Sequence, residues 1–199
     1  NDLKNSIEWG HLTGKPVVIH SFAYKVNFLD AASNAGKAIP EKPLASYNNY
    51  FIGNDPSKWA GDCKIYQAVT YKNIYPNIDI RYYSDGNNLK YDFLVYPGGN
   101  PGAIALQYAG PQLSLKDKQL IIKTSVAEVK ELYPYSYQVV SGQKNEVDCK
   151  YVLRNNVVTF DLKGYDRNSL LVIDPTLIFS TYTGSTAENW GFTATPGPD

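Results

Sequence analysis

Runs in which apolar and polar residues alternate recur along most of the chain. In LKYDFLVY (89–96), positions 89, 91, 93 and 95 are apolar or aromatic and share one face of an extended strand. The run VVTFDL (157–162) repeats this pattern at 158, 160 and 162. Segments 84–88 and 155–156 are rich in Asn, and the first contains Gly, so both accept positive φ at low cost. They are therefore predicted to be hairpin turns.

About a dozen such runs predict an all-β chain, with turn residues between them. They are Pro16–His20, Phe22–Leu29, Ile65–Tyr71, Ile78–Tyr83, Leu89–Tyr96, Ala103–Tyr108, Gln119–Lys123, Val126–Leu132, Tyr135–Val140, Glu146–Leu153, Val157–Leu162, Leu170–Ile173 and Leu177–Tyr182. This spacing is typical of an antiparallel β-sandwich or two packed sheets. Very little helix is expected, with one or two turns over Asp55–Trp59, where Asp caps and Pro follows.

Composition narrows the range of partners. The 199 residues are 43% hydrophobic, enough for a packed core, and 17 of them are Tyr, which favours strands. The formal net charge is zero, so nothing directs the chain to nucleic acid or to an anionic membrane surface. No apolar run approaches the length of a membrane span. The chain contains no Met, and we interpret its start at Asn1 as processed or truncated.

Several blocks of sequence carry a resemblance to a known family. They are NYFIGNDPSKW (49–59), VTYKNIYPNIDIRYY (69–83), LKYDFLVYPGGNPGAIAL (89–106), PYSYQ (134–138) and LLVIDPTLIFSTYTGS (170–185). Together they resemble the bacterial domain of unknown function that precedes SBBP-type β-propeller repeats in large secreted proteins. Bacteroidetes members of that family often carry a gliding-motility or type IX secretion signal. The resemblance implies a secreted or cell-surface location and supplies no catalytic residues.

The same blocks suggest how the chain is divided. Residues 1–46 are expected to form N-terminal strands and a flexible loop over Asp30–Ala45, in the same domain as the main β-domain at 47–178. Residues 179–199 resemble the start of a truncated propeller-type repeat, although Thr183-Gly184-Ser185 departs from the usual motif.

Polar candidates each have two interpretations. Asp79 and Arg81 share a strand face and Asp92 follows across the predicted hairpin, which favours a structural ion pair over a carboxylate pair for glycoside chemistry. Asp174 precedes Pro175 and is expected to cap a turn, with a calcium ligand as the alternative. No cofactor and no metal site are predicted, because the two histidines lack a ligand cluster.

Aromatic residues and cysteines are the last two groups of candidate residues. Exposed rings could stack on a ligand, and the candidates are Trp59, Tyr66, Tyr82, Tyr83 and Tyr96; the alternative is that most belong to strands and the core. Cys63 and Cys149 either form one disulfide or are two free thiols.

These observations predict a non-catalytic structural or interaction module rather than an enzyme. Its expected partners are downstream β-propeller repeats of the same polypeptide, with a glycan or another surface protein as further candidates, in a setting related to adhesion. The alternative is a carbohydrate-binding module that uses exposed Tyr and Trp, and a glycoside hydrolase is the remote alternative.

Overall fold

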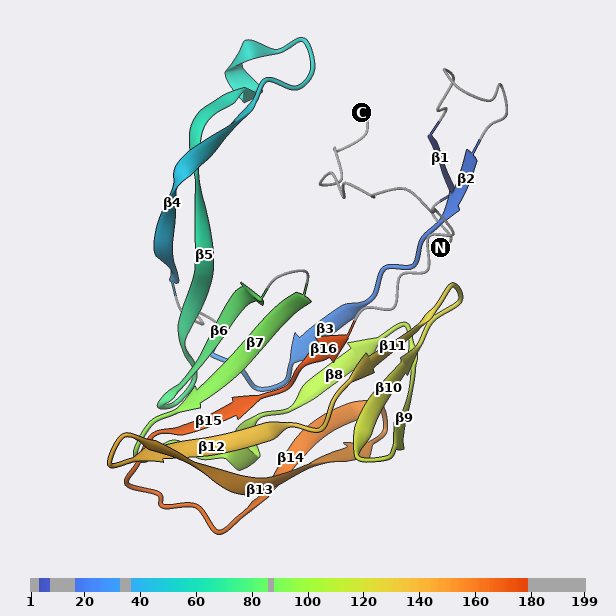
Figure 1. The fold of residues 1–199 in the computed structure, drawn as a ribbon. Coiled ribbons are helices and arrows are strands. Elements are labelled where there is room, and N and C mark those ends of the chain that lie inside the picture. Colours follow the sequence, from blue (N-terminus) through green and yellow to red (C-terminus); the bar gives the residue numbers. More distant parts are fainter. Residues whose placement is uncertain (1–3, 8–16, 33–36, 86–87, 179–199) are drawn as a thin grey trace.

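A computed structural model describes residues 4–7, 17–32, 37–85 and 88–178. Strands dominate these residues, with two short 3₁₀ helices (Figure 1). The strands are β1 Lys4–Ile7, β2 Val17–His20, β3 Lys25–Phe28, β4 Ala38–Tyr50, β5 Ala60–Tyr75, β6 Ile78–Asp85, β7 Asn88–Val95, β8 Leu106–Ala109, β9 Gln112–Lys116, β10 Gln119–Lys123, β11 Glu128–Glu131, β12 Tyr135–Val140, β13 Gln143–Arg154, β14 Val157–Lys163, β15 Leu171–Asp174 and β16 Leu177–Ile178. The helices are η1 Pro56–Lys58 and η2 Pro101–Ala103.

Two sheets form the body of the molecule. The larger has ten strands in the order β3-β8-β14-β13-β12-β15-β7-β6-β5-β4, and the smaller has four in the order β16-β11-β10-β9. Strands β1 and β2 pair separately. All the strand pairings are antiparallel. The all-β fold expected from the alternation is therefore confirmed.

The ten-stranded sheet curls so that β3, at one end, approaches the base of β5, next to the other end (Figure 1). Beyond β3, the backbone N–H of Ala32 donates to the carbonyl of Ile74 near the end of β5, at 3.0 Å. The hydroxyl of Tyr75 donates to the carbonyl of Leu29, also at 3.0 Å. These bonds tie these two parts of the sheet together across its concave face.

The core fills this concave face, where alternate side chains point inward. Val147, Cys149 and Tyr151 of β13 are buried, as alternation predicts. Phe93 of β7 is fully buried, and its ring makes an edge contact with the ring of Phe160 at a centroid distance of 5.7 Å. Leu120, Ile122 and Val129 of the smaller sheet complete the same cluster. The two sheets therefore share one core.

Several predicted turns are confirmed. Asn155 and Asn156 both have positive φ, 50° and 63°, and join β13 to β14. Asp55 caps η1, where its side chain accepts from the backbone N–H of Ser57 at 3.0 Å. The turn between β6 and β7 contains residues outside the described part of the chain, although the two strands do pair as predicted.

The prediction of a flexible loop over Asp30–Ala45 was wrong for the second half of this segment. Strand β4 begins at Ala38 and pairs with β5 along its length, with two irregularities in register. It is an edge strand, which explains how it accommodates Pro40 and Pro43 without losing sheet bonds. Most of its side chains are exposed, so the apolar alternation that reveals a half-buried strand is missing. Strands β1 and β9 also escaped prediction.

Glu131 of β11 links the two sheets. It is buried, and its carboxylate accepts hydrogen bonds from Tyr108 at 2.8 Å, Tyr91 at 3.0 Å and Tyr151 at 3.3 Å. These three tyrosines come from β8, β7 and β13 of the larger sheet. Burial raises the pKa of Glu131, and the tyrosine hydroxyls partly offset this effect. One side chain of the small sheet thus bonds to three strands of the large one.

We predict that Glu131→Ala lowers the free energy of unfolding by roughly 3 kcal/mol, because the buried hydroxyls of Tyr91 and Tyr108 lose their acceptor, whereas Tyr151 keeps the carbonyl of Leu132 at 3.0 Å. Glu131→Gln keeps an acceptor oxygen and should cost much less. Glu131→Gln should also make the free energy of unfolding depend less on pH. The reason is that a carboxyl with a raised pKa loses its stabilising effect as pH rises through that pKa, whereas the amide does not ionise. Urea unfolding measures both changes. Glu128→Ala, on the exposed face of the same strand, is the control. Equal effects of Glu131→Ala and Glu128→Ala would contradict the prediction.

Candidate functional site

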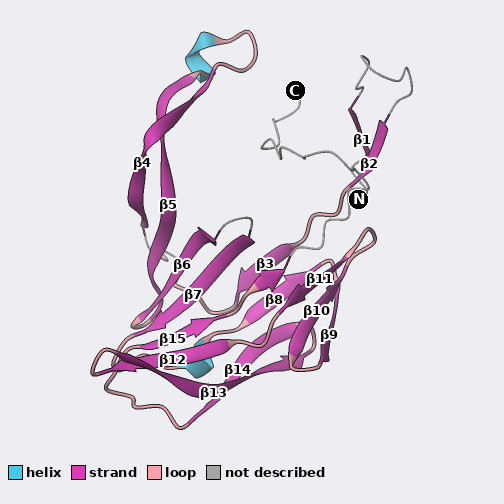
Figure 2. Ribbon diagram, viewed as in Figure 1, coloured by secondary structure: helices cyan, strands magenta, loops and turns pink. Residues whose placement is uncertain are grey.

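A two-stranded arm is the most distinctive feature of the surface. Strands β4 and β5 extend beyond the sheet and project from the body, with η1 at the far end (Figure 2). Most side chains in the outer part of the arm are exposed. An isolated pair of strands is marginally stable in water unless something packs on it. The arm is therefore a surface that contact with another molecule would stabilise.

The arm ends in an apolar cluster that we call the knob, formed by Tyr47, Tyr50, Phe51, Ile52 and Trp59. Phe51 is 61% exposed and Trp59 is 42% exposed. Their rings meet edge to face with centroids 5.6 Å apart. The indole N–H of Trp59 donates to the carbonyl of Gly53 at 3.2 Å. The knob is therefore held in one arrangement although it faces solvent.

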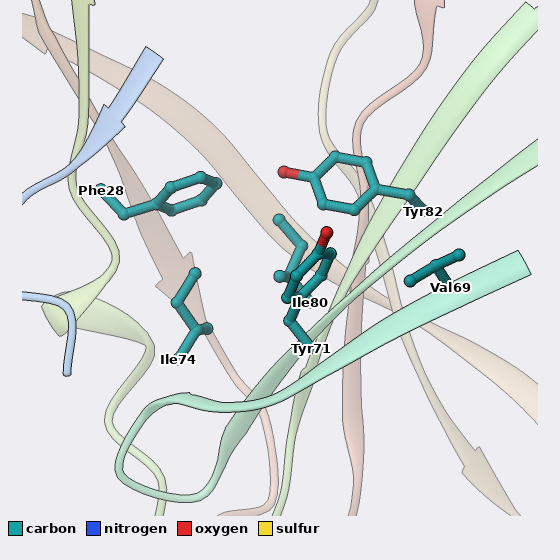
Figure 3. A pocket seen from close by; sticks show the side chains of 6 residues that line it. All are labelled: Phe28, Val69, Tyr71, Ile74, Ile80 and Tyr82. Carbon is teal, nitrogen blue, oxygen red and sulfur yellow. The ribbon is translucent and has the colours of Figure 1, made fainter. Parts of the chain in front are cut away.

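An apolar cavity of about 540 Å³ lies at the base of the arm (Figure 3). The residues that line it lie on β3, β5 and β6. They are Phe28, Val69, Tyr71, Ile74, Ile80 and Tyr82. The only side-chain polar atoms in this lining are the hydroxyls of the two tyrosines. Burial raises the pKa of Tyr82 to about 12, with a smaller effect from Tyr71. The cavity suits an apolar occupant.

The opposite face of the same strands carries a row of polar residues. Arg81 of β6 lies directly across from Asp92 of β7. Asp174 of β15 adjoins Asp92, because the neighbouring residues Ile173 and Phe93 are paired. Arg81 Nε lies 3.2 Å from a carboxylate oxygen of Glu41, on β4. The row therefore draws side chains from β4, β6, β7 and β15, and its two ends, Glu41 and Asp174, are far apart in sequence.

The two aspartates of this row have different surroundings. The hydroxyl of Tyr83 donates to Asp92 at 3.2 Å, and the ammonium of Lys90 lies 3.5 Å from Asp174. Burial first, and then the charge of Asp174, raise the pKa of Asp92 to about 6, while the Tyr83 bond and the charge of Arg81 act against this. Asp92 therefore titrates close to neutral pH.

Three tyrosines, one just before β12 and two within it, extend the polar row. Tyr133, Tyr135 and Tyr137 follow one another at alternate positions, with centroid distances of 6.4 Å and 5.6 Å between successive rings. The Lys144 ammonium lies 4.1 Å from the ring centre of Tyr137. Tyr135 pairs with Asp174 across the strands, so the rings adjoin the two aspartates. This face combines aromatic surface with hydrogen-bonding groups.

The predicted aromatic candidates do not form one strip. Trp59 lies in the knob and Tyr66 on the stem of the arm, where it is 38% exposed. Tyr82 lines the cavity, whereas Tyr83 points to the opposite face and bonds to Asp92. The ring of Tyr96 lies by the ammonium of Lys72, at 5.7 Å.

The polar candidates are only partly paired as expected. Arg81 does face Asp92 across the hairpin, but its close ion pair is with Glu41. Asp79 pairs instead with Lys72 at 2.7 Å and accepts from a backbone N–H in β5 at 2.8 Å. Asp174 forms an ion pair with Lys90 where a turn cap was expected, so this interpretation was wrong. These carboxylates therefore pair with cations on neighbouring strands, and the sequence alone did not show which strands are neighbours.

Cys63 and Cys149 are both free, so the disulfide alternative is not realised. Cys63 lies on the arm and Cys149 is buried in β13, where desolvation raises its pKa to about 11. Within the described ranges, no group of three His, Cys, Asp or Glu side chains could hold a metal ion. No helix in the part of the chain that the structure describes is long and apolar enough to cross a membrane.

Sequence reasoning missed Glu131, Glu41 and most of the knob. The knob did carry a signal, because Tyr50-Phe51-Ile52 directly precedes the loop residues Gly53 and Asn54, and apolar residues next to a turn are exposed unless something covers them. Glu131 gave no signal, since its tyrosine partners lie 20 to 40 positions away.

A model of the family described as Domain of unknown function (DUF7948) matches residues 2–176 of the chain. No curated protein and no solved structure shows a significant match.

We predict that Asp92→Asn raises the free energy of unfolding by about 1–2 kcal/mol at pH 7.5 and changes it little at pH 4.5. The reason is that a carboxyl with a raised pKa loses stability as pH rises through about 6, whereas the amide does not ionise. The expected gain is smaller than the full shift implies, because solvent screens part of it. Urea unfolding at the two pH values measures the difference. Asp148→Asn, at an exposed aspartate, is the matched control. A gain of equal size at both pH values would contradict the prediction.

Proposed function

We propose that this chain, which belongs to the DUF7948 family of domains of unknown function, is a non-catalytic interaction module. Its two-sheet body holds the β4–β5 arm, and the knob at the end of the arm is the contact surface. The observation that carries the proposal is the exposure of five apolar side chains, two of them in ring contact, at the end of a projecting hairpin. Such patches mark interaction sites in soluble proteins.

The β4 edge of the arm is suited to contact through side chains rather than through strand addition. Strand β4 is the outer strand of the arm, and Pro40 and Pro43 remove two backbone donors from its sequence. Its edge is therefore a poor template for another strand. The knob, by contrast, is rich in Tyr, Trp and Phe, the residue types that dominate the energetics of protein interfaces.

The expected setting remains a secreted or cell-surface protein in which β-propeller repeats of the same polypeptide, or another surface protein, contact the module. The resemblance of the quoted sequence blocks supports this setting. A role in adhesion would follow from the location alone. Neither of the two cavities described, at the arm base and beside Tyr151, contains Asp92 or Asp174, which gives no support to a glycoside hydrolase.

Amide hydrogen exchange tests the proposal without knowledge of the partner. At concentrations too low for self-association of the isolated chain, exchange over residues 47–59 should be slower in the full natural polypeptide than in the isolated chain, because contact covers the knob. Phe51→Ser should remove this protection. Val139→Ser, at an equally exposed apolar residue on β12, should keep it. Identical exchange in both contexts would contradict the proposal.

A carbohydrate-binding role is the second candidate, and the face with Tyr133, Tyr135 and Tyr137 favours it. The rings of Tyr135 and Tyr137 are inclined at 33° and can both stack on a sugar, whereas the ring of Tyr133 stands at 88° to that of Tyr135. Beside them, the buried atoms Arg81 Nε and Asp174 Oδ1 make no hydrogen bond within the described residues, and each lies near an opposite charge, Glu41 at 3.2 Å and Lys90 at 3.5 Å. The site differs from the scattered candidates Trp59, Tyr66, Tyr82 and Tyr96.

A thermal-shift titration against soluble polysaccharides tests this candidate. A glycan that binds only the folded chain raises the melting temperature with concentration. Tyr137→Ala should then weaken binding roughly tenfold, since stacking on one ring contributes on the order of 1 kcal/mol. Phe51→Ser, far away on the arm, should not change it. Absence of any shift across the panel, or equal losses in both variants, would exclude the tyrosine face as a glycan site.

A further inference from the structure

We infer that the knob of one molecule seats in the apolar cavity of a second copy of this chain. The inference rests on the proposed function, because the arm is the contact element in both, and it adds the identity of the partner. Knob and cavity are the two apolar features of the surface that this structure describes in detail, and they lie at opposite ends of the same arm.

The knob is organised for insertion. The edge-to-face contact of Phe51 with Trp59 and the bond from the indole to Gly53 fix the two largest rings without a partner. A contact surface that is already ordered loses less conformational entropy on binding. A flat stack of rings would suit a sugar, whereas two rings inclined at 63°, as those of Phe51 and Trp59 are, form a wedge that suits a concave apolar site.

The cavity is built to receive such a wedge. Ile74 and Ile80 are buried, Val69 and Tyr71 are partly exposed, and Tyr71 meets Tyr82 edge to face at 6.1 Å. No charged side chain lines it. None of the five knob side chains is charged, and the Lys64 ammonium beside the knob lies 5.9 Å from the ring centre of Tyr47. The volume of about 540 Å³ is of the size that holds an organic ligand, and an aromatic side chain fits within it.

A knob cannot reach the cavity of its own molecule. Trp59 directly precedes β5, whereas Tyr71 lines the cavity from the same strand. Twelve residues of extended chain separate them by roughly 40 Å, at about 3.3 Å per residue. The two surfaces are on one paired arm, so they can meet only between molecules.

Two arms that lie antiparallel to each other place each knob at the cavity of the other molecule. This arrangement is isologous, because the same two surfaces meet twice about one twofold axis, and it closes as a dimer. Two contacts held by one geometry also reinforce each other, because the second forms at high effective concentration. A single knob-to-cavity contact would instead leave free surfaces at both ends and extend into a chain of molecules.

Sedimentation velocity of the purified chain over a wide concentration range tests the inference. We expect a monomer–dimer equilibrium. Phe51→Ser in the knob and Tyr71→Ser in the cavity should each weaken it at least tenfold, and both residues are exposed enough to be replaced without loss of the fold. Val139→Ser is the control and should leave the equilibrium unchanged. A mixture of the two weakened variants should recover part of the dimer, because their heterodimer retains one intact contact between the knob of Tyr71→Ser and the cavity of Phe51→Ser.

Other outcomes separate this inference from the proposed function. A chain that stays monomeric at every concentration, or a dimer insensitive to Tyr71→Ser, would overturn the second copy as partner. If the knob were still protected from exchange in the full polypeptide, the interaction module would stand with a different partner.

Binding of the monomer to vesicles of uncharged phosphatidylcholine, lost in Phe51→Ser, would identify a lipid surface as the occupant and overturn the inference. Absence of exchange protection together with a knob-dependent dimer would support self-association alone.

Discussion

The hydrogen bonds to Glu131 are the constraint on which the arrangement of the two sheets depends. Apolar packing between sheets is non-directional, and many relative placements would bury similar area. A buried carboxylate is different, because leaving it without donors costs several kcal/mol. Tyr91, Tyr108 and Tyr151 supply those donors from three separate strands, so the favourable placements are those that bring all three hydroxyls to β11.

This link also fixes the strands that carry the surface features. Tyr91 lies on β7, next to β6 in the large sheet, and β6 in turn pairs with β5. The base of the arm is thus two strands away from a strand held by the buried carboxylate. Beyond the base, the arm loses burial, and its order depends on local contacts such as those of Trp59 and Asn49, whose side-chain oxygen accepts from the backbone N–H of Asp62 at 2.9 Å. Burial therefore decreases from the core to the knob, where local contacts alone hold the side chains.

The sequence predicted what depends on nearest neighbours along the chain. Alternation located β7 and β14, Asn155-Asn156 marked a hairpin, and Asp55 capped its helix, because each of these depends on contacts within a few residues. Strand β4 was missed because an exposed edge strand has no buried face to create alternation. The candidate surfaces were largely missed for another reason: the cavity joins Phe28 to Tyr82 and the polar row joins Glu41 to Asp174, and such separations are set by sheet order.

The two faces of the strands at the arm base make different demands on a partner, and this separates the two candidate functions. On one face, the cavity and the knob are apolar and uncharged, and they gain free energy only by removal from water. On the other, Asp92, Arg81 and Asp174 are charged or titratable, so a partner must replace the hydrogen bonds that water provides. A glycan can do this and an apolar wedge cannot. The period-two alternation of β6, which sends Ile80 and Tyr82 to one face and Arg81 and Tyr83 to the other, therefore allows both surfaces to be used independently.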